Sequence, residues 1–201
     1  MKKQVLIVLG LIVYLSSFAQ TPFLTEKKNI KEVREIENQL QSVFIGFDTT
    51  RVQQDYFPGA VKDKDYYPIK FKRTNDDFFP ELFVHYYYDE NDSSVVCASY
   101  DWEIMNYVQN IFTDGHRFET EQKRKKEYLK KYKEVKKDVI NSLGEPDKID
   151  ESKGDEGYFY KLEWFKEDID VLILFSFSTK LKAMGPAKFG SYRIRLKLEY
   201  K

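Results

Sequence analysis

The C-terminal part of the chain alternates between apolar and polar residues with a period of two, and this pattern constrains the fold most strongly. In the last strand-like run Tyr192, Ile194, Leu196, Leu198 and Tyr200 alternate with Arg193, Arg195, Lys197 and Glu199. Because successive side chains of a strand point to opposite faces, one face of 192–200 is expected in the core and the other in water. We expect this run to close one side of an antiparallel sheet.

Five other segments also predict strands. Residues 158–165 alternate in the same way, and residues 169–178 are so apolar that a central strand buried on both faces is expected. Residues 82–88 and 94–102 flank a polar turn, which is typical of an antiparallel hairpin. A short strand over 66–72 contains Pro68, which has no backbone N–H and therefore predicts an edge position.

Residues 101–112 allow two interpretations. Asp101 could cap a helix carrying Trp102, Met105, Val108 and Phe112, or the strand could continue to about Glu103. We favour a strand that ends near Glu103 and is followed by a loop or a short helix.

Two longer segments have the three-to-four-residue spacing of an amphipathic helix. The first stripe is Ile30, Val33, Ile36, Leu40, Val43 and Phe47, which predicts a helix over 26–45 ended by Gly46. The second stripe is Tyr128, Tyr132, Val135, Val139 and Leu143, which predicts a helix over 120–143 ended by Gly144 and Pro146.

These elements predict an α+β fold in which an antiparallel sheet of five to six strands packs against two long helices. The length from Gln20 to Lys201 suits one domain. Each helix precedes antiparallel strands, so two similar α-β-β lobes, with repeat units 26–112 and 118–201, are one interpretation. The simpler interpretation, which we prefer, is two independent helices that end with similar stop residues.

Residues 1–19 have the pattern of a secretory signal peptide. Lys2 and Lys3 precede an apolar run, Val5 to Leu15, and Ser17-Phe18-Ala19 places small residues before a cleavage site ahead of Gln20. The apolar run is about half of the roughly 20 residues that a membrane-spanning helix needs. We therefore expect an exported bacterial protein, periplasmic or secreted, whose mature chain begins at Gln20.

Composition excludes several classes of protein. Removal of residues 1–19 leaves 31 basic and 33 acidic residues, and this net charge of −2 argues against a nucleic-acid-binding protein. The 33 aromatic side chains are enough for a large core. The single cysteine, Cys97, lies in an apolar run, so it cannot form an internal disulfide and is expected to be a buried thiol.

No motif indicates catalysis, a cofactor or a metal. His85 and His116 lack a second histidine at ligand spacing, and neither a nucleophile-elbow motif nor a phosphate-binding loop occurs. The acidic residues lie in predicted turns. Asp89, Asn91 and Ser93 have the spacing of a calcium loop, but the sixth and twelfth positions do not fit, so a hairpin turn is the better interpretation.

Three features suggest contact with a macromolecule. Tyr86 and Tyr88 would share one face of a strand, where aromatic rings can stack on sugars or anchor protein partners. The long loop 180–191 carries Met184 and Phe189. Residues 123–137 hold nine basic residues, including Lys130 and Lys137, as a positive helix face that could meet an anionic membrane, an acidic glycan or an acidic protein.

The function expected from the sequence is therefore non-catalytic. We expect an exported cell-envelope or secreted protein that binds a protein or glycan partner, with Tyr86, Tyr88, Met184, Phe189, Lys130 and Lys137 as candidate contact residues. Weak peripheral contact with an anionic membrane is a further expectation. The alternative is a small exported hydrolase with an unfamiliar carboxylate site, which would need two acids across an apolar cleft.

Overall fold

The fold is dominated by a single antiparallel sheet. The structure is a computed structural model, and it describes residues 23–47, 66, 68–103, 114–184 and 187–201. The helices in these ranges are α2 (Ile30–Gln39), α3 (Asp114–Lys123) and α4 (Lys125–Leu143). The strands are β1 (Val43–Phe47), β2 (Pro68–Arg73), β3 (Leu82–Tyr88), β4 (Val95–Glu103), β5 (Lys148–Gly154), β6 (Gly157–Phe165), β7 (Ile169–Ser178), β8 (Lys182–Met184), β9 (Ala187–Phe189) and β10 (Tyr192–Tyr200).

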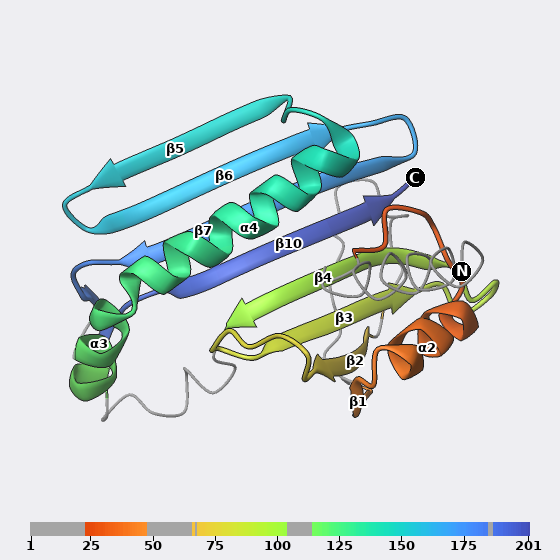
Figure 1. The fold of residues 1–201 in the computed structure, drawn as a ribbon, viewed down its shortest axis with the longest axis horizontal. Helices are drawn as coiled ribbons and strands as arrows, with labels where there is room; N and C mark the ends of the chain where they lie inside the picture. The colour runs from red at the N-terminus through yellow and green to blue at the C-terminus, as the bar shows by residue number, and fades with distance from the viewer. Residues whose placement is uncertain (1–22, 48–65, 67, 104–113, 185–186) are drawn as a thin grey trace, which may run out of the picture.

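Eight of the described strands form one sheet in the order β1-β2-β3-β4-β10-β7-β6-β5 (Figure 1). Every neighbouring pair is antiparallel. The strands β8 and β9 form a separate two-stranded hairpin between β7 and β10, within the segment expected to be a loop. In each half of the chain a helix comes first, the next strand lies at an edge of the sheet, and the following strands approach the centre. The two halves meet where β4 pairs with β10.

The expected sheet of five to six strands against two long helices is wrong. The sheet has eight strands, and the described residues contain three helices, of which α2 and α3 have ten residues each. The two-lobe interpretation stays a prediction: the helix-then-strands order of both halves agrees with it, but a shared order is not evidence of duplication.

The first helix is shorter than expected because local hydrogen bonds fix both of its ends. Asn29 accepts hydrogen bonds from the N–H groups of Lys31 and Glu32, and the Glu32 carboxylate accepts one from the Asn29 N–H. This capping box starts α2 four residues after the expected beginning. At the other end Gln41 has φ 55°, which takes the backbone out of the helix. The apolar residues after it form β1 instead.

The second helical segment is divided at Arg124. Helix α3 ends at Lys123, and α4 runs from Lys125 to Leu143, the expected last residue. Gly144 has φ 81°, a conformation that glycine adopts without a Cβ clash, and its N–H donates to the Ile140 carbonyl over 2.8 Å. The predicted stop at Gly144 is therefore confirmed.

Several strand predictions agree with the structure, and two positions differ. Strand β3 has the expected bounds, and β4 includes residues 101–103, which confirms the strand interpretation there. Residues 104–112, the rest of the ambiguous segment, lie outside the described residues. Strand β2 lies inside the sheet and not at its edge. Pro68 is compatible with this place because it occupies the first position of the strand, where a missing N–H is tolerated. Strand β10 lies at the centre and pairs with both β4 and β7.

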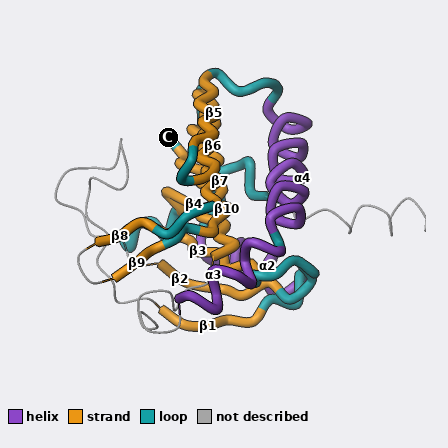
Figure 2. Tube along the Cα trace, turned by 90° about the vertical axis from the view of Figure 1, so that its left-hand side faces the viewer, coloured by secondary structure: helices purple, strands orange, loops and turns teal. Residues whose placement is uncertain are grey.

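One face of the sheet is covered by helices and forms the core. In Figure 2 α4 stands as a separate layer beside the β5–β6–β7 half, and its stripe Tyr128, Tyr132, Val135 and Val139 is buried. The Tyr132 ring stacks on Phe175 of β7, with ring centroids 5.0 Å apart. Burial of these aromatic surfaces is the main favourable contribution to folding.

The opposite face of the sheet carries the charged residues of the alternating strands. Arg195 lies opposite Asp101 in the β10–β4 register and forms an ion pair with it. Lys197 on the same face is only 7% exposed. The sequence analysis expected this face of β10 to be in water, and that expectation is wrong at Lys197. Leu172 and Leu174 of β7 are half-buried there, so β7 is central but less buried on this face than expected.

Candidate functional site

The structure separates the residues that the sequence suggested as contacts. Tyr86 is fully buried, and its hydroxyl donates to Glu37 over 2.5 Å. Burial raises the pKa of Tyr86 well above its usual value. The expectation that Tyr86 lies on an exposed tyrosine face is therefore wrong. Tyr88 is half-buried and packs against the core, beyond a register shift that follows Tyr87.

The other candidates lie on opposite sides of the sheet. Lys130 and Lys137 are exposed on α4. Met184 ends β8 and Phe189 ends β9, but their side chains lie outside the described part of the structure. Figure 2 places α4 and the β8–β9 hairpin on opposite sides of the sheet, so these four residues do not form one site.

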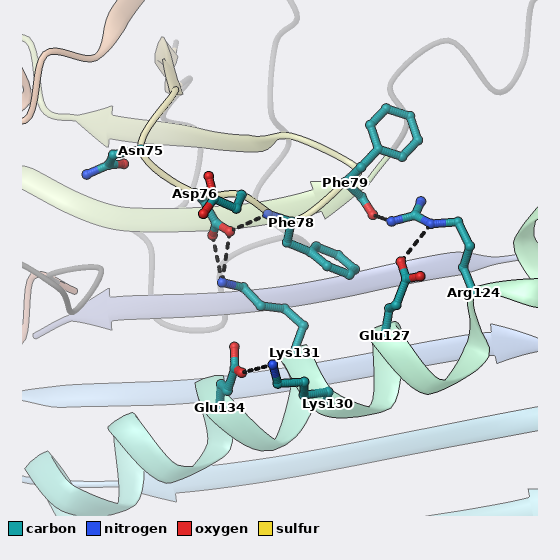
Figure 3. Close-up of a pocket in the computed structure, with 10 residues that line it drawn as sticks. Asn75, Asp76, Phe78, Phe79, Arg124, Glu127, Lys130, Lys131 and Glu134 are labelled. Carbon is teal, nitrogen blue, oxygen red and sulfur yellow. Dashed lines mark hydrogen bonds and ion pairs between the residues drawn. The ribbon is translucent and has the colours of Figure 1, made fainter.

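A pocket of about 490 Å³ lies between α4 and the connection from β2 to β3 (Figure 3). Its lining is Asn75, Asp76, Asp77, Phe78, Phe79, Arg124, Glu127, Lys130, Lys131 and Glu134. Six of the seven charged side chains in this lining form ion pairs with one another, and the exception is Asp77. Lys131 lies 2.8 Å from Asp76, Arg124 lies 2.9 Å from Glu127, and Lys130 lies 3.8 Å from Glu134.

Asp76 is the most highly coordinated group in this pocket. Its carboxylate accepts hydrogen bonds from the Trp102 indole N–H over 2.8 Å, from the Phe78 N–H over 3.0 Å and from Lys131. Its side chain is only 3% exposed. These hydrogen bonds and the ion pair with Lys131 hold the β2–β3 connection against α4. This geometry suits a structural role.

Arg124 fills the other end of the pocket. Its guanidinium donates to the Phe79 carbonyl and lies over the Phe79 ring, 4.9 Å from the ring centroid. It also lies 5.6 Å from the centroids of Phe78 and Tyr128. The break between α3 and α4 therefore places a cation among three aromatic rings, which fixes the helix junction.

The described residues give no support for the hydrolase alternative. A second pocket is lined by Glu163, Asp170 and Glu199 beside apolar side chains, but each of these carboxylates forms an ion pair with a lysine: Glu163 with Lys161, Asp170 with Lys201 and Glu199 with Lys197. Among the described residues, no three His, Cys, Asp or Glu side chains gather as metal ligands. The Asp89–Ser93 segment is a hairpin turn in which the Asn91 N–H donates to Asp89 over 2.9 Å. The His116 side chain lies outside the described part, and His85 is 8% exposed within β3.

The most unusual surface of the described structure is β1, which the sequence analysis assigned to a helix. Its large apolar side chains are strongly exposed: Val43 48%, Phe44 47%, Ile45 48% and Phe47 58%. They account for half of the eight exposed large hydrophobic residues in the described chain. The run Val43-Phe44-Ile45, β-branched and aromatic without a charge, is the sequence signal that could have predicted a strand.

The two edges of the described sheet differ in chemistry. Strand β5 at one edge contains Lys148, Asp150, Glu151 and Lys153, and charges of this kind discourage pairing with another strand. Strand β1 at the other edge contains no charged residue. A register shift between Phe44 and Gly46 is the only irregularity in its pairing with β2.

Arg34 of α2 stands beside the exposed rings of β1. Its guanidinium carbon lies 5.8 Å from the ring centroids of both Phe44 and Phe47. Arg34 is exposed and forms no ion pair with a described residue. The edge thus combines apolar side chains with one unpaired positive charge.

No protein-family model, curated protein or solved structure matches this chain. Within the described residues, no helix combines the length and the apolar character needed to cross a membrane.

Proposed function

We propose that this chain is an exported, non-catalytic protein that binds a partner protein by accepting an extended segment at β1. The observation that carries the proposal is the exposure of four large apolar side chains in one five-residue edge strand. Large exposed apolar patches are typical of interaction sites. The outer edge of a strand also offers unpaired backbone N–H and C=O groups to an added strand.

The chemistry of the edge favours a protein segment over a glycan. An extended peptide satisfies the backbone groups of β1 at strand spacing, and its alternate side chains can contact Phe44 and Phe47 on one face and Val43 on the other. Arg34 adds a charge that selects an acidic side chain next to an apolar one. The partner segment is therefore expected to be extended, apolar and to contain one Asp or Glu.

The test compares two isoleucines at opposite edges of the sheet. Ile45 in β1 is 48% exposed and Ile149 in β5 is 59% exposed, so Ile45→Lys and Ile149→Lys add the same charge at similar surface positions. Extended peptides of about seven residues are first selected for binding to the wild-type chain from a display library. Urea unfolding of both variants confirms that each is folded.

Strand addition predicts that Ile45→Lys weakens binding of the selected peptides by at least about tenfold, because a charge on an edge opposes pairing. Ile149→Lys should bind like the wild type. Bound peptide should slow amide hydrogen exchange over residues 43–47, and N-methylation of the peptide should abolish binding only at alternate positions. Equal binding by both variants, or no protection of 43–47, would overturn the proposal.

Export is tested separately. Intact-mass analysis of the protein from its native host should give a chain that begins at Gln20. Recovery of a chain that keeps Met1 would contradict export without affecting the peptide-binding test.

A further inference from the structure

The outward face of α4 carries a row of four lysines that nothing in the fold explains. Lys126, Lys130, Lys133 and Lys137 are all exposed, and their spacing of four, three and four residues places them within about 60° of the helix circumference. The buried residues of α4 lie on the opposite side of the helix. We call these four residues the lysine ridge.

The charges of the lysine ridge are almost unpaired. Lys126, Lys133 and Lys137 form no ion pair with a described residue, and Lys130 has only Glu134 at 3.8 Å, with both side chains well exposed. The neighbouring basic residues differ. Lys131 is paired with Asp76 and Lys136 with Glu151. The closer ion pairs therefore lie on the flanks of α4, and among the described residues three of the four ridge lysines have no ion pair.

The lysine ridge is unfavourable for the helix that carries it. Like charges three or four residues apart repel each other along a helix. Lys126 also lies in the first turn, where the positive end of the helix dipole opposes a cation, and Arg124 supplies no side-chain cap there. Folding alone would favour fewer lysines at these positions, so the ridge suggests an external anion.

The shape of the ridge favours a planar anion over a chain. Helix α4 is an outer layer of the molecule, standing beyond the sheet in Figure 2. Its lysines form a row about 16 Å long on the outer side of the helix, and only Lys130 also lines the pocket that contains Phe78 and Phe79. Proteins that bind anionic chains usually hold them along a groove with stacking aromatic residues, which the other three lysines lack. A flat anionic surface can contact all four ammonium groups at once.

We propose that the lysine ridge docks the protein on an anionic phospholipid surface. The contact is electrostatic and involves no insertion, because none of the exposed large hydrophobic residues belongs to α4. Lysine ammonium groups suit this contact, since they act as hydrated point charges and do not impose the fixed geometry of arginine. This binding is independent of the strand-accepting edge at β1.

The test measures co-sedimentation of the full chain with vesicles. The ridge variant replaces Lys126, Lys130, Lys133 and Lys137 with Gln. The control replaces four exposed lysines elsewhere, Lys27, Lys31, Lys153 and Lys180, with Gln and has the same net charge. All three proteins keep the same N-terminal residues, so any contribution of residues 1–19 to membrane binding cancels.

Wild type and control should bind vesicles that contain about one-third phosphatidylglycerol in phosphatidylcholine, at about 0.05 M salt. The ridge variant should bind about two to three orders of magnitude more weakly, since each lysine near an anionic surface contributes about fivefold. Binding should disappear at about 0.5 M salt and on pure phosphatidylcholine vesicles. The ridge variant should also resist urea at least as well as the wild type.

Three outcomes would overturn the proposal. The wild type could fail to bind the anionic vesicles, or the ridge variant could bind them as well as the control. The wild type could instead bind soluble heparin while ignoring the vesicles, which would assign the ridge to a polyanionic chain.

Discussion

Arg73 and Glu37 form a fully buried ion pair that joins the first helix to the sheet. The Arg73 Nη2 atom lies 2.6 Å from Glu37 Oε1, and both side chains are inaccessible to solvent. Tyr86 and Ser42 also donate hydrogen bonds to the Glu37 carboxylate. Four residues from α2, β2, β3 and the turn before β1 are thus held together beneath the strand proposed to bind a partner.

Removal of one member of this pair should destabilise the protein strongly. Glu37→Gln leaves the Arg73 charge buried without its counter-ion, and such changes cost about 3–5 kcal/mol. The double variant Glu37→Leu/Arg73→Met should lose less than the sum of the two single variants, because no charge remains buried. Urea unfolding measures all of these values, and strict additivity would show that the pair is not coupled.

Asp76 should be far more sensitive to substitution than its neighbour Asp77. Asp76→Ala leaves the buried Trp102 indole N–H and the Lys131 ammonium without their acceptor, and the free energy of unfolding should fall by about 2–3 kcal/mol. Asp77 is exposed, so Asp77→Ala should change it by less than about 0.5 kcal/mol. Tryptophan fluorescence during urea unfolding compares the two, and similar losses would show that Asp76 is not an anchor.

Cys97 should be unreactive while the protein is folded. Its side chain is fully buried with Tyr66 and Tyr87, and burial raises the pKa of the thiol, so little thiolate forms near neutral pH. A thiol reagent such as Ellman's should label about one group in urea and none in the native protein, with the labelling rate following the opening of β4. Rapid labelling in buffer would contradict this burial.

Asp147 should make stability depend on pH in the acid range. The Phe165 N–H donates to its carboxylate over 2.7 Å and lowers the pKa of Asp147 below its usual 3.8, with a further contribution from Lys166. A lowered folded-state pKa adds stability above about pH 3.8, which is lost as the pH falls through the folded value.

Asp147→Asn should therefore lower the melting temperature at pH 7 and make little difference near pH 2. Asp150→Asn, an exposed carboxyl in the adjacent strand β5, is the control and should have little effect at either pH. A constant difference between wild type and Asp147→Asn at all pH values would show that the charge is not responsible.

Local signals in the sequence were sufficient where neighbouring residues in the chain determine the structure. Strand β3 and the end of α4 at Gly144 follow directly from alternation and from a glycine stop. Burial of Cys97 was also predictable, because its apolar neighbours place it in the core. These features depend on backbone geometry and on the hydrophobicity of residues that are adjacent in the sequence.

Positions that depend on distant partners could not be predicted in this way. The polar strand β5 has seven exposed residues and no alternation, and it exists because β6 pairs with it. The stripe that appeared to continue a helix through Val43 and Phe47 became β1, because Gln41 leaves the helix and β2 supplies hydrogen-bond partners.

For the two candidate surfaces, β1 and the lysine ridge, some properties also follow from the sequence and others only from the tertiary structure. The sequence determined that residues 125–137 belong to a basic helix, since charge and helical spacing are local properties. Only the tertiary structure decided which lysines remain unpaired, because Asp76 and Glu151 reach α4 from other elements. It also placed Tyr86 in the core and Phe44 on the surface, since burial depends on which elements pack over a residue and not on its hydrophobicity.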